Sequence, residues 1–213
     1  MIEVEKFRIA YFPVPKCACS SAKNALYELA NGKPYIDQSP GKTMHLHKIF
    51  PTGSGFKIDE WQRASDLGYL KICIVRDPLD RLRSAYTNRV IFHREINPDS
   101  LRRASIEFLP CKPTFEEFAD NLAEYQLIPS ILHHTLPITH YLGDDSSRYD
   151  HIFNLASIEE FFCLLDSFSD RRITRYHRQN GGGAISVPPL SQSTLNKLFE
   201  YYKSDYNSLA NYF

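Results

Sequence analysis

The sequence predicts an α/β fold in which a parallel β-sheet is flanked by helices, within a single domain over residues 1–213. Three short apolar segments, at 7–12, 69–75 and 149–155, have the length and composition of buried strands. Each of them leads into a segment whose apolar residues recur at helical spacing. Apolar strands that alternate with helices are typical of a parallel sheet with helices packed on its faces.

The composition excludes a strong general attraction for charged macromolecules. Hydrophobic residues make up 43% of the 213 residues, and 25 basic residues balance 25 acidic residues. A formal net charge of zero gives no bulk field that favours nucleic acid or an anionic membrane surface. No apolar run is long enough to predict a membrane span, and residues 1–15 lack the pattern of a signal peptide. We therefore expect no nucleic-acid partner and no membrane span.

The cysteines indicate the redox compartment. Five of them are scattered without the spacing of a disulfide framework: Cys17, Cys19, Cys73, Cys111 and Cys163. An odd number at such positions predicts reduced thiols, which are typical of a reducing compartment. We expect a cytoplasmic protein, with a membrane-peripheral protein or a luminal domain of a longer chain as the alternatives.

The first strand ends in a polar turn that leads directly into a helix. The strand reads FRIAYF at 7–12, and the turn PVPKCACSS at 13–21 contains a lysine, two cysteines and two serines. Ser20 or Ser21 is the expected N-cap of the helix, because serine side chains accept from the first N–H groups. The apolar residues of this helix form one buried stripe at helical spacing: Ala22, Ala25, Leu26 and Leu29.

A turn between a strand and a helix N-terminus is a general site for anions, because unpaired N–H groups and the positive end of the helix dipole meet there. In this turn Lys16 adds a positive charge, and the two serines add hydroxyl donors. The residues expected to bind a phosphate or sulfate group are Lys16, Cys17, Ala18, Cys19, Ser20 and Ser21. One alternative is an ordinary surface lysine before a serine-capped helix. Another is a zinc site, in which Cys17 and Cys19 join His45 and His47.

The second strand repeats this arrangement. YLKICIV at 69–75 is followed by Arg76, and Asp77 with Pro78 is the expected start of the next helix. The packing side of that helix is expected to consist of Leu79, Leu82, Tyr86 and Val90, and the opposing polar row of Arg81, Ser84 and Asn88. Arg76 and Ser84 are therefore candidates to bind one phosphate together. The alternative is an ion pair of Arg76 with Asp77 beside a solvated helix face.

The remaining segments are expected to be mostly helical or irregular. Residues 31–58 contain many prolines and glycines and predict an irregular excursion, followed by a short helix at 59–68. Two capping boxes predict further helix starts: Thr114 with Glu117, and Ser157 with Glu160. Residues 178–191 are expected to form a flexible loop, and residues 191–212 a closing helix.

Two motifs of this chain resemble those of a known family. PKCACSS at 15–21 resembles the 5′-phosphosulfate loop of the sulfotransferases, and RDPLDRLRSAY at 76–86 resembles their 3′-phosphate element. The second motif is most similar to that of the carbohydrate sulfotransferases. A weaker likeness extends through residues 114–122 and 149–155 to the final loop and helix at 178–212. The resemblance implies the P-loop-NTPase-like sulfotransferase fold.

The resemblance also implies a reaction and its cofactor. A sulfuryl group would pass from 3′-phosphoadenosine 5′-phosphosulfate (PAPS) to a hydroxyl of a carbohydrate or glycolipid acceptor, without a metal, and leave adenosine 3′,5′-bisphosphate (PAP). By likeness, Lys16, Ser20 and Ser21 hold the 5′-phosphosulfate, and Lys16 stabilises the leaving oxygen. The other residues expected to contact the nucleotide hold its 3′-phosphate: Arg76, Ser84, Arg178 and Asn180.

Such a reaction needs a base for the acceptor hydroxyl. Family members often carry a His-x-His pair in this part of the chain, and HLH occurs here at 45–47. Histidine suits the role because its unperturbed pKa is about 6.5. We expect His47 to be the base, with His45 as the alternative or as a substrate-binding residue. The weaker candidates are Asp59, Glu60, His133, His134 and His140. A non-catalytic protein that binds phosphonucleotides or sulfated glycans is the rival interpretation.

Overall fold

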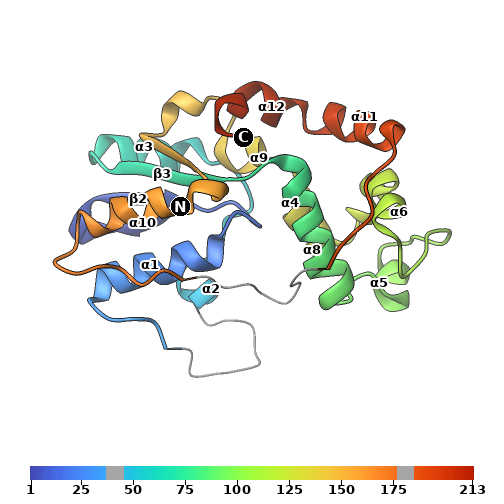
Figure 1. Ribbon diagram of the computed structural model, residues 1–213, viewed down its shortest axis with the longest axis horizontal. Helices are drawn as coiled ribbons and strands as arrows, with labels where there is room; N and C mark the ends of the chain where they lie inside the picture. Colours follow the sequence, from blue (N-terminus) through green and yellow to red (C-terminus); the bar gives the residue numbers. More distant parts are fainter. Residues whose placement is uncertain (37–45, 177–184) are drawn as a thin grey trace. The chain divides into compact units, whose positions relative to one another are not determined.

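The computed structural model describes residues 1–36, 46–176 and 185–213 (Figure 1). The chain divides into two compact units: unit 1 comprises 1–76, 138–178 and 208–213, and unit 2 comprises 77–137 and 179–207. Each unit is built around its own buried core. The expectation of a single domain stays a prediction.

Unit 1 contains a four-stranded sheet in the order β1-β2-β3-β4. The strands β2 (Ile9–Phe12), β3 (Leu70–Val75) and β4 (His151–Asn154) are parallel, which confirms the predicted parallel sheet. β1 (Ile2–Val4) pairs antiparallel with β2 at the edge. The sequence does not predict β1, because a strand of three residues is too short to show a period of two.

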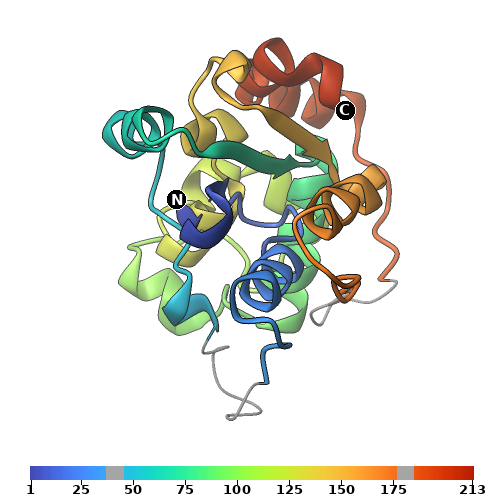
Figure 2. The same cartoon turned by 90° about the vertical axis from the view of Figure 1, so that its left-hand side faces the viewer.

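The helices of unit 1 pack around this sheet. α1 (Cys19–Asn31) and α10 (Ile158–Asp166) lie side by side, α10 contacts β4, and α3 (Ile58–Asp66) contacts β3 (Figures 1 and 2). The predicted stripe of α1 is confirmed, because all four of its apolar residues are buried: Ala22, Ala25, Leu26 and Leu29. The other helical elements of unit 1 are η1 (Glu5–Phe7), α2 (Leu46–Ile49), α9 (Ile138–Leu142), η3 (Ser146–Arg148), η4 (Leu155–Ser157) and η5 (Ala210–Tyr212).

Unit 2 is helical as far as the structure describes it. α4 (Pro78–Ala85) continues into η2 (Tyr86–Phe92), a π-helical segment. The next helices are α5 (Pro98–Arg103), α6 (Phe115–Asp120), α7 (Leu122–Tyr125), α8 (Pro129–Thr135) and α11 (Gln192–Tyr201), and α12 (Lys203–Leu209) runs up to residue 209. The predicted closing helix is therefore interrupted at Tyr202, which ends α11. Among the helices of the described residues, none has both the length and the apolar character that a bilayer crossing requires.

The helices predicted to start after Asp77, Thr114 and Ser157 are all present, but only the first two have the predicted side-chain cap. Asp77 caps α4, with Pro78 in its first turn. The box of Thr114 and Glu117 caps α6 reciprocally. The box predicted at Ser157 is absent, because Ser157 belongs to the preceding 3₁₀ turn and makes no side-chain capping bond to α10.

The helix after β3 buries more than its apolar side. Leu82, Tyr86 and Val90 are buried in the core of unit 2, as predicted. Arg81 and Asn88 of the predicted polar row are buried as well, with 0% and 4% exposure, so the alternative of a solvated helix face is wrong at these two positions. The helical pattern of the sequence predicts that charged residues lie at the surface. A charged residue is buried in a helix when groups distant in sequence form hydrogen bonds with it.

Such a partner exists for Arg81. Its guanidinium donates to the carbonyl oxygens of His134 at 3.3 Å and Thr135 at 3.4 Å, and also to that of Leu136. It lies 5.9 Å from the centre of the Tyr202 ring. The last carbonyl groups of a helix have no intrahelical partner. The buried Arg81 therefore caps the C-terminal end of α8.

We expect Arg81→Met to lower the free energy of unfolding by at least about 2 kcal/mol, because buried carbonyls lose a charged donor while the apolar stem is retained. Arg83→Met is the matched control, since Arg83 is exposed and pairs with Asp80 at 2.9 Å. Such a surface pair contributes less than about 1 kcal/mol. Urea unfolding of both variants makes the comparison. Equal losses at the two positions would contradict the capping role.

Candidate active site

The two sequence motifs begin at the same edge of the sheet. β2 and β3 are parallel neighbours, and Phe12 at the end of β2 pairs with Cys73 near the end of β3. The carboxyl ends of parallel neighbouring strands meet at one edge, which is the usual place for ligands in such sheets. The loop at Lys16 and the residue Arg76 therefore both leave the sheet at this edge.

The loop between β2 and α1 has an unusual backbone. Lys16 has φ 68° and Ala18 has φ 52°, so two residues with side chains occupy the left-handed region that favours glycine. Cys17 between them donates its N–H to the carbonyl of Val14 at 3.3 Å. Turns with left-handed residues direct successive N–H groups into a concave surface that binds anions. Strained backbone of this kind is concentrated at functional sites.

The same turn leaves the N-terminus of α1 without a side-chain cap. The N-cap is Ala18, so the predicted capping by Ser20 or Ser21 is wrong and both serines lie in the first helical turn. The first ladder bond runs from Ala22 N–H to Ala18 O at 3.0 Å. The N–H groups of Cys19, Ser20 and Ser21 precede it, where a helix has no partner of its own to offer. We call the loop and first turn, residues 16–21, the anion cradle.

The structure brings a predicted base to the anion cradle. His47 lies on α2, which packs against α1, and its Nε2 is 3.1 Å from the hydroxyl oxygen of Ser20. Two residues that were selected for different reasons are therefore in contact. His45 lies outside the described residues.

Sequence reasoning missed Lys23, which belongs to the same group of side chains. It is fully buried on α1, and its Nζ lies 3.0 Å from His47 Nδ1 and 2.8 Å from Thr52 Oγ1. Cys19 Sγ is 3.5 Å from the same Thr52 oxygen. Burial lowers the pKa of Lys23, and the nearby Cys19 thiol partly opposes that effect. The only signal in the sequence is spacing, since Lys23 is one helical turn beyond Ser20.

In the second motif a side chain caps the helix N-terminus, in contrast to the first motif. Asp77 accepts the N–H groups of Leu79 at 2.9 Å and Asp80 at 3.0 Å, and the Tyr206 hydroxyl donates to it at 3.2 Å. The N-terminus of α4 is therefore already bonded to a carboxylate and is not an anion trap. Within the described part of the chain, Arg76 has no hydrogen bond or ion pair, so the alternative of an ion pair with Asp77 is not found there.

Of the other residues predicted to contact the nucleotide, Ser84 lies within the described part of the chain. Ser84 is half-buried on α4 in unit 2. Arg178 and Asn180 lie outside the described residues. The segment before them is anchored to α1, because the buried carboxylate of Glu28 accepts from Thr174 N–H at 3.3 Å and from the Tyr176 hydroxyl at 2.7 Å. The helix that forms the anion cradle therefore also holds the start of the predicted nucleotide loop.

The weaker base candidates have structural partners. Glu60 bonds to the N-terminal ammonium of Met1 and lies 3.0 Å from Lys57. His140 Nε2 is 2.6 Å from the carbonyl of Ser54, and His134 Nδ1 is 2.7 Å from that of Ser130.

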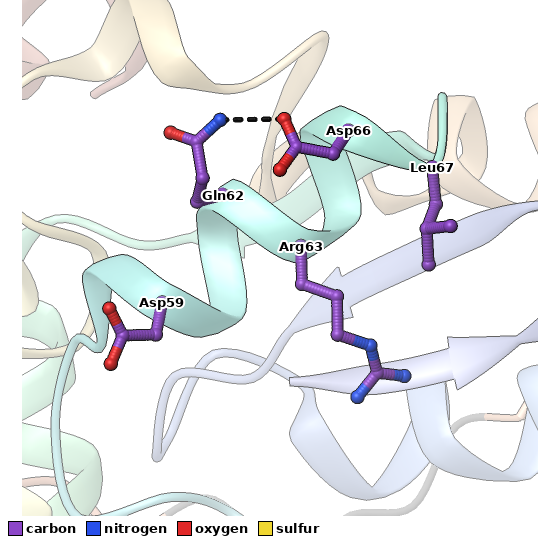
Figure 3. Close-up of a pocket in the computed structure, with 5 residues that line it drawn as sticks. All are labelled: Asp59, Gln62, Arg63, Asp66 and Leu67. Carbon is purple, nitrogen blue, oxygen red and sulfur yellow. Dashed lines mark hydrogen bonds between the residues drawn. The ribbon is translucent and has the colours of Figure 1, made fainter.

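Asp59 lines a depression formed by α3 and by Leu67, the residue that follows it. The lining residues are Asp59, Gln62, Arg63, Asp66 and Leu67 (Figure 3). Gln62 donates to Asp66 at 2.7 Å within the helix, as the dashed line in Figure 3 marks. None of the residues of the anion cradle takes part in this depression, so it gives no support to Asp59 as the base.

The zinc alternative gains no support from the described residues. Within those ranges, no group of three or more histidine, cysteine, aspartate or glutamate side chains is placed to hold a metal ion. One member of the predicted ligand set, His45, lies outside the described residues. All five cysteines carry free thiols.

The sequence of this chain is similar to those of known proteins. A sequence model described as "Sulfotransferase family" matches residues 1–210. Carbohydrate sulfotransferase 10 of Gallus gallus is 28% identical over 131 residues, 56% of this chain and 36% of the relative. Carbohydrate sulfotransferase 11 of Rattus norvegicus is 29% identical over 107 residues, 46% of this chain and 30% of the relative. The aligned part thus spans about a third of each relative. No solved structure matches.

We expect the left-handed turn of the anion cradle to limit which residues position 18 accepts. Ala18→Val should lower the melting temperature by about 2–8 °C, because a left-handed residue with a side chain costs about 1–2 kcal/mol and β-branching adds to that cost. Ala18→Gly is the matched control and should change it by less than about 2 °C. If valine is tolerated as well as glycine, the strained turn has been assigned wrongly.

Proposed function

This chain belongs to the sulfotransferase family, and we propose that it transfers a sulfuryl group from PAPS to a hydroxyl group of a carbohydrate or glycolipid. The observation that carries the proposal is the anion cradle, an uncapped helix N-terminus behind a left-handed lysine turn, with His47 in contact with Ser20. The named carbohydrate sulfotransferases among the relatives support the class of acceptor. A cytoplasmic location stays a prediction.

The anion cradle fits the 5′-phosphosulfate of the donor. PAPS supplies an activated sulfuryl group whose bond to the 5′-phosphate oxygen breaks during transfer. The N–H groups of Cys19, Ser20 and Ser21 hold that end of the nucleotide, and Lys16 provides the positive charge. Because negative charge grows on the leaving oxygen, a fixed ammonium stabilises the transition state more than the ground state.

The acceptor hydroxyl must lose its proton as its oxygen bonds to sulfur. His47 is assigned as the base, and its Nε2 already contacts a hydroxyl oxygen, that of Ser20, at 3.1 Å. A base needs this hydrogen-bonding distance to the proton that it removes. His45 is assigned as the alternative base or as a residue that binds the acceptor.

The other end of the nucleotide carries the 3′-phosphate. Arg76 is assigned to it, because a half-buried arginine without a partner among the described residues is available for a forked contact. Ser84, Arg178 and Asn180 keep the roles in 3′-phosphate binding that the family resemblance gives them.

Calorimetry with PAP tests the cofactor assignment before any acceptor is known. We expect the wild-type protein to bind PAP, and Arg76→Ala to weaken binding by about tenfold or more, because a hydrogen bond to a charged group is worth about 1.5–3 kcal/mol. Arg83→Ala, an exposed arginine of the same motif, is the control and should bind like wild type. Failure of wild type to bind PAP, or an unchanged Kd for Arg76→Ala, contradicts the assignment.

Kinetics test the role of Lys16. We expect Lys16→Ala to lower kcat more than tenfold, because a contact that strengthens in the transition state contributes more than about 1.4 kcal/mol to the barrier. Lys33→Ala, an exposed lysine just beyond α1, is the control. The assay follows transfer of labelled sulfate from PAPS to a mixture of desulfated polysaccharides. A near-normal kcat with a raised KM refutes this role, and PAP binding without turnover on any acceptor favours the non-catalytic interpretation.

A further inference from the structure

A lysine that the proposed mechanism does not use is buried directly behind the proposed base. Lys23 has 0% exposure, and its Nζ contacts His47 Nδ1 at 3.0 Å, on the side of the ring opposite to Ser20. We propose that Lys23 is a positioning residue that sets the tautomer of His47 and receives its Nδ1 proton during the reaction. This inference rests on the proposed sulfuryl transfer for its kinetic meaning, whereas the tautomer can be tested without turnover.

The surroundings of Lys23 favour an amine that changes charge. Within the described part of the chain, Lys23 makes no ion pair with a carboxylate, and its partners there are His47, Thr52 and the Cys19 thiol. A buried ammonium without a counter-charge is costly, so the neutral amine becomes accessible at a lower pH than for a solvated lysine. The lowered pKa of Lys23 has this cause.

The contacts on the two ring nitrogens define two states of the pair. When Lys23 is an ammonium, it can only donate, so Nδ1 of His47 accepts and Nε2 carries the proton that points to Ser20. When Lys23 is a neutral amine, its lone pair accepts a hydrogen bond from Nδ1–H of His47, and Nε2 carries the lone pair that accepts from a hydroxyl. The distances of 3.0 Å and 3.1 Å suit both states. Only the second state has a basic nitrogen at the anion cradle.

The proton balance of the step follows from the second state. The acceptor hydroxyl gives its proton to Nε2 of His47 while its oxygen forms the new bond to sulfur, and the electron pair of the broken S–O bond stays on the 5′-phosphate oxygen. The Nδ1 proton of His47 passes to Nζ of Lys23. The pair ends as a neutral imidazole beside an ammonium, and it returns its proton to water through Nε2 after the product leaves.

Other titratable groups near Lys23 do not replace this pairing. From α1 itself, the Cys19 thiol acts on Lys23 and only partly opposes the lowering of the Lys23 pKa by burial, and its sulfur lies 3.5 Å from Thr52 Oγ1. On α10, the other helix packed on α1, Glu159 and Asp166 each lie 2.7 Å from Nη2 of Arg175, and Glu160 is exposed. From β2, the Tyr11 hydroxyl has its pKa raised by burial and stays neutral. His47 is therefore the titratable partner of Lys23 from α2.

Nitrogen-15 NMR of the histidine rings tests the tautomer directly. The chain has 8 histidines, so the His47 signals are assigned by their loss in His47→Gln. Between about pH 6 and about pH 10, we expect His47 to change from the Nε2–H to the Nδ1–H tautomer as the pair loses its proton. Lys23→Met should abolish the change, and Lys48→Met, an exposed lysine on α2, should preserve it. One unchanging tautomer in wild type, or the same change in Lys23→Met, overturns the proposal.

Kinetics separate this role from a structural one. In wild type, kcat should rise with pH over the same range as the tautomer change, because the neutral amine is the active form. Lys23→Arg keeps the charge permanently and should be at least about tenfold slower than Lys23→Met, with melting temperatures confirming that both variants fold. A faster arginine variant shows that Lys23 acts as a fixed charge and overturns the proposal. If the tautomer change occurs without turnover on any acceptor, the proposed function fails while the pairing stands.

Discussion

The turn between β2 and α1 is the constraint on which the rest of the site depends. Two residues with side chains, Lys16 and Ala18, take left-handed backbone angles there, and the helix starts without a side-chain cap as a result. A serine cap would have satisfied the first N–H groups and removed them from any ligand. The chain instead accepts local backbone strain and keeps those donors directed at the edge of the sheet, where an oxyanion can complete them.

A single helix connects the parts of the site in unit 1. The first turn of α1 carries the anion cradle, the second turn presents Lys23 to His47, and the third places the buried Glu28 under the segment that ends at Tyr176. α10 and α2 pack against this helix and its apolar stripe is buried, so these groups have little freedom to move relative to one another. A rigid support of this kind suits a reaction that depends on alignment of the donor, the base and the acceptor.

The sequence predicts those features that follow from local pattern. Apolar runs identified β2, β3 and β4, helical spacing identified the buried stripe of α1, and the box at Thr114 identified the start of α6. Features that depend on contacts distant in sequence were missed or wrongly assigned. The N-cap of α1 is Ala18 and not a serine, because the turn before the helix is left-handed. A serine side chain caps a helix when the residue has extended backbone angles at the N-cap position.

Buried charges were missed for a related reason. Arg81 and Lys23 look like surface residues in any helical pattern, and their partners are carbonyl groups 53 to 55 residues away and a histidine 24 residues away. Part of the candidate site was nevertheless visible in the sequence, since Ser20 and His47 were selected from two motifs and are in contact although they lie 27 residues apart. The segments that follow β2 and β3, the two strand exits, also differ in which of their residues can be substituted. At the first exit the donors are backbone N–H groups, so in the proposed site anion binding depends on the unusual angles of the loop, and Lys16 is the loop side chain whose charge the proposed reaction needs. At the second exit Asp77 accepts the first N–H groups of the helix, so the proposed phosphate contact there depends on the guanidinium of Arg76 and not on backbone amides.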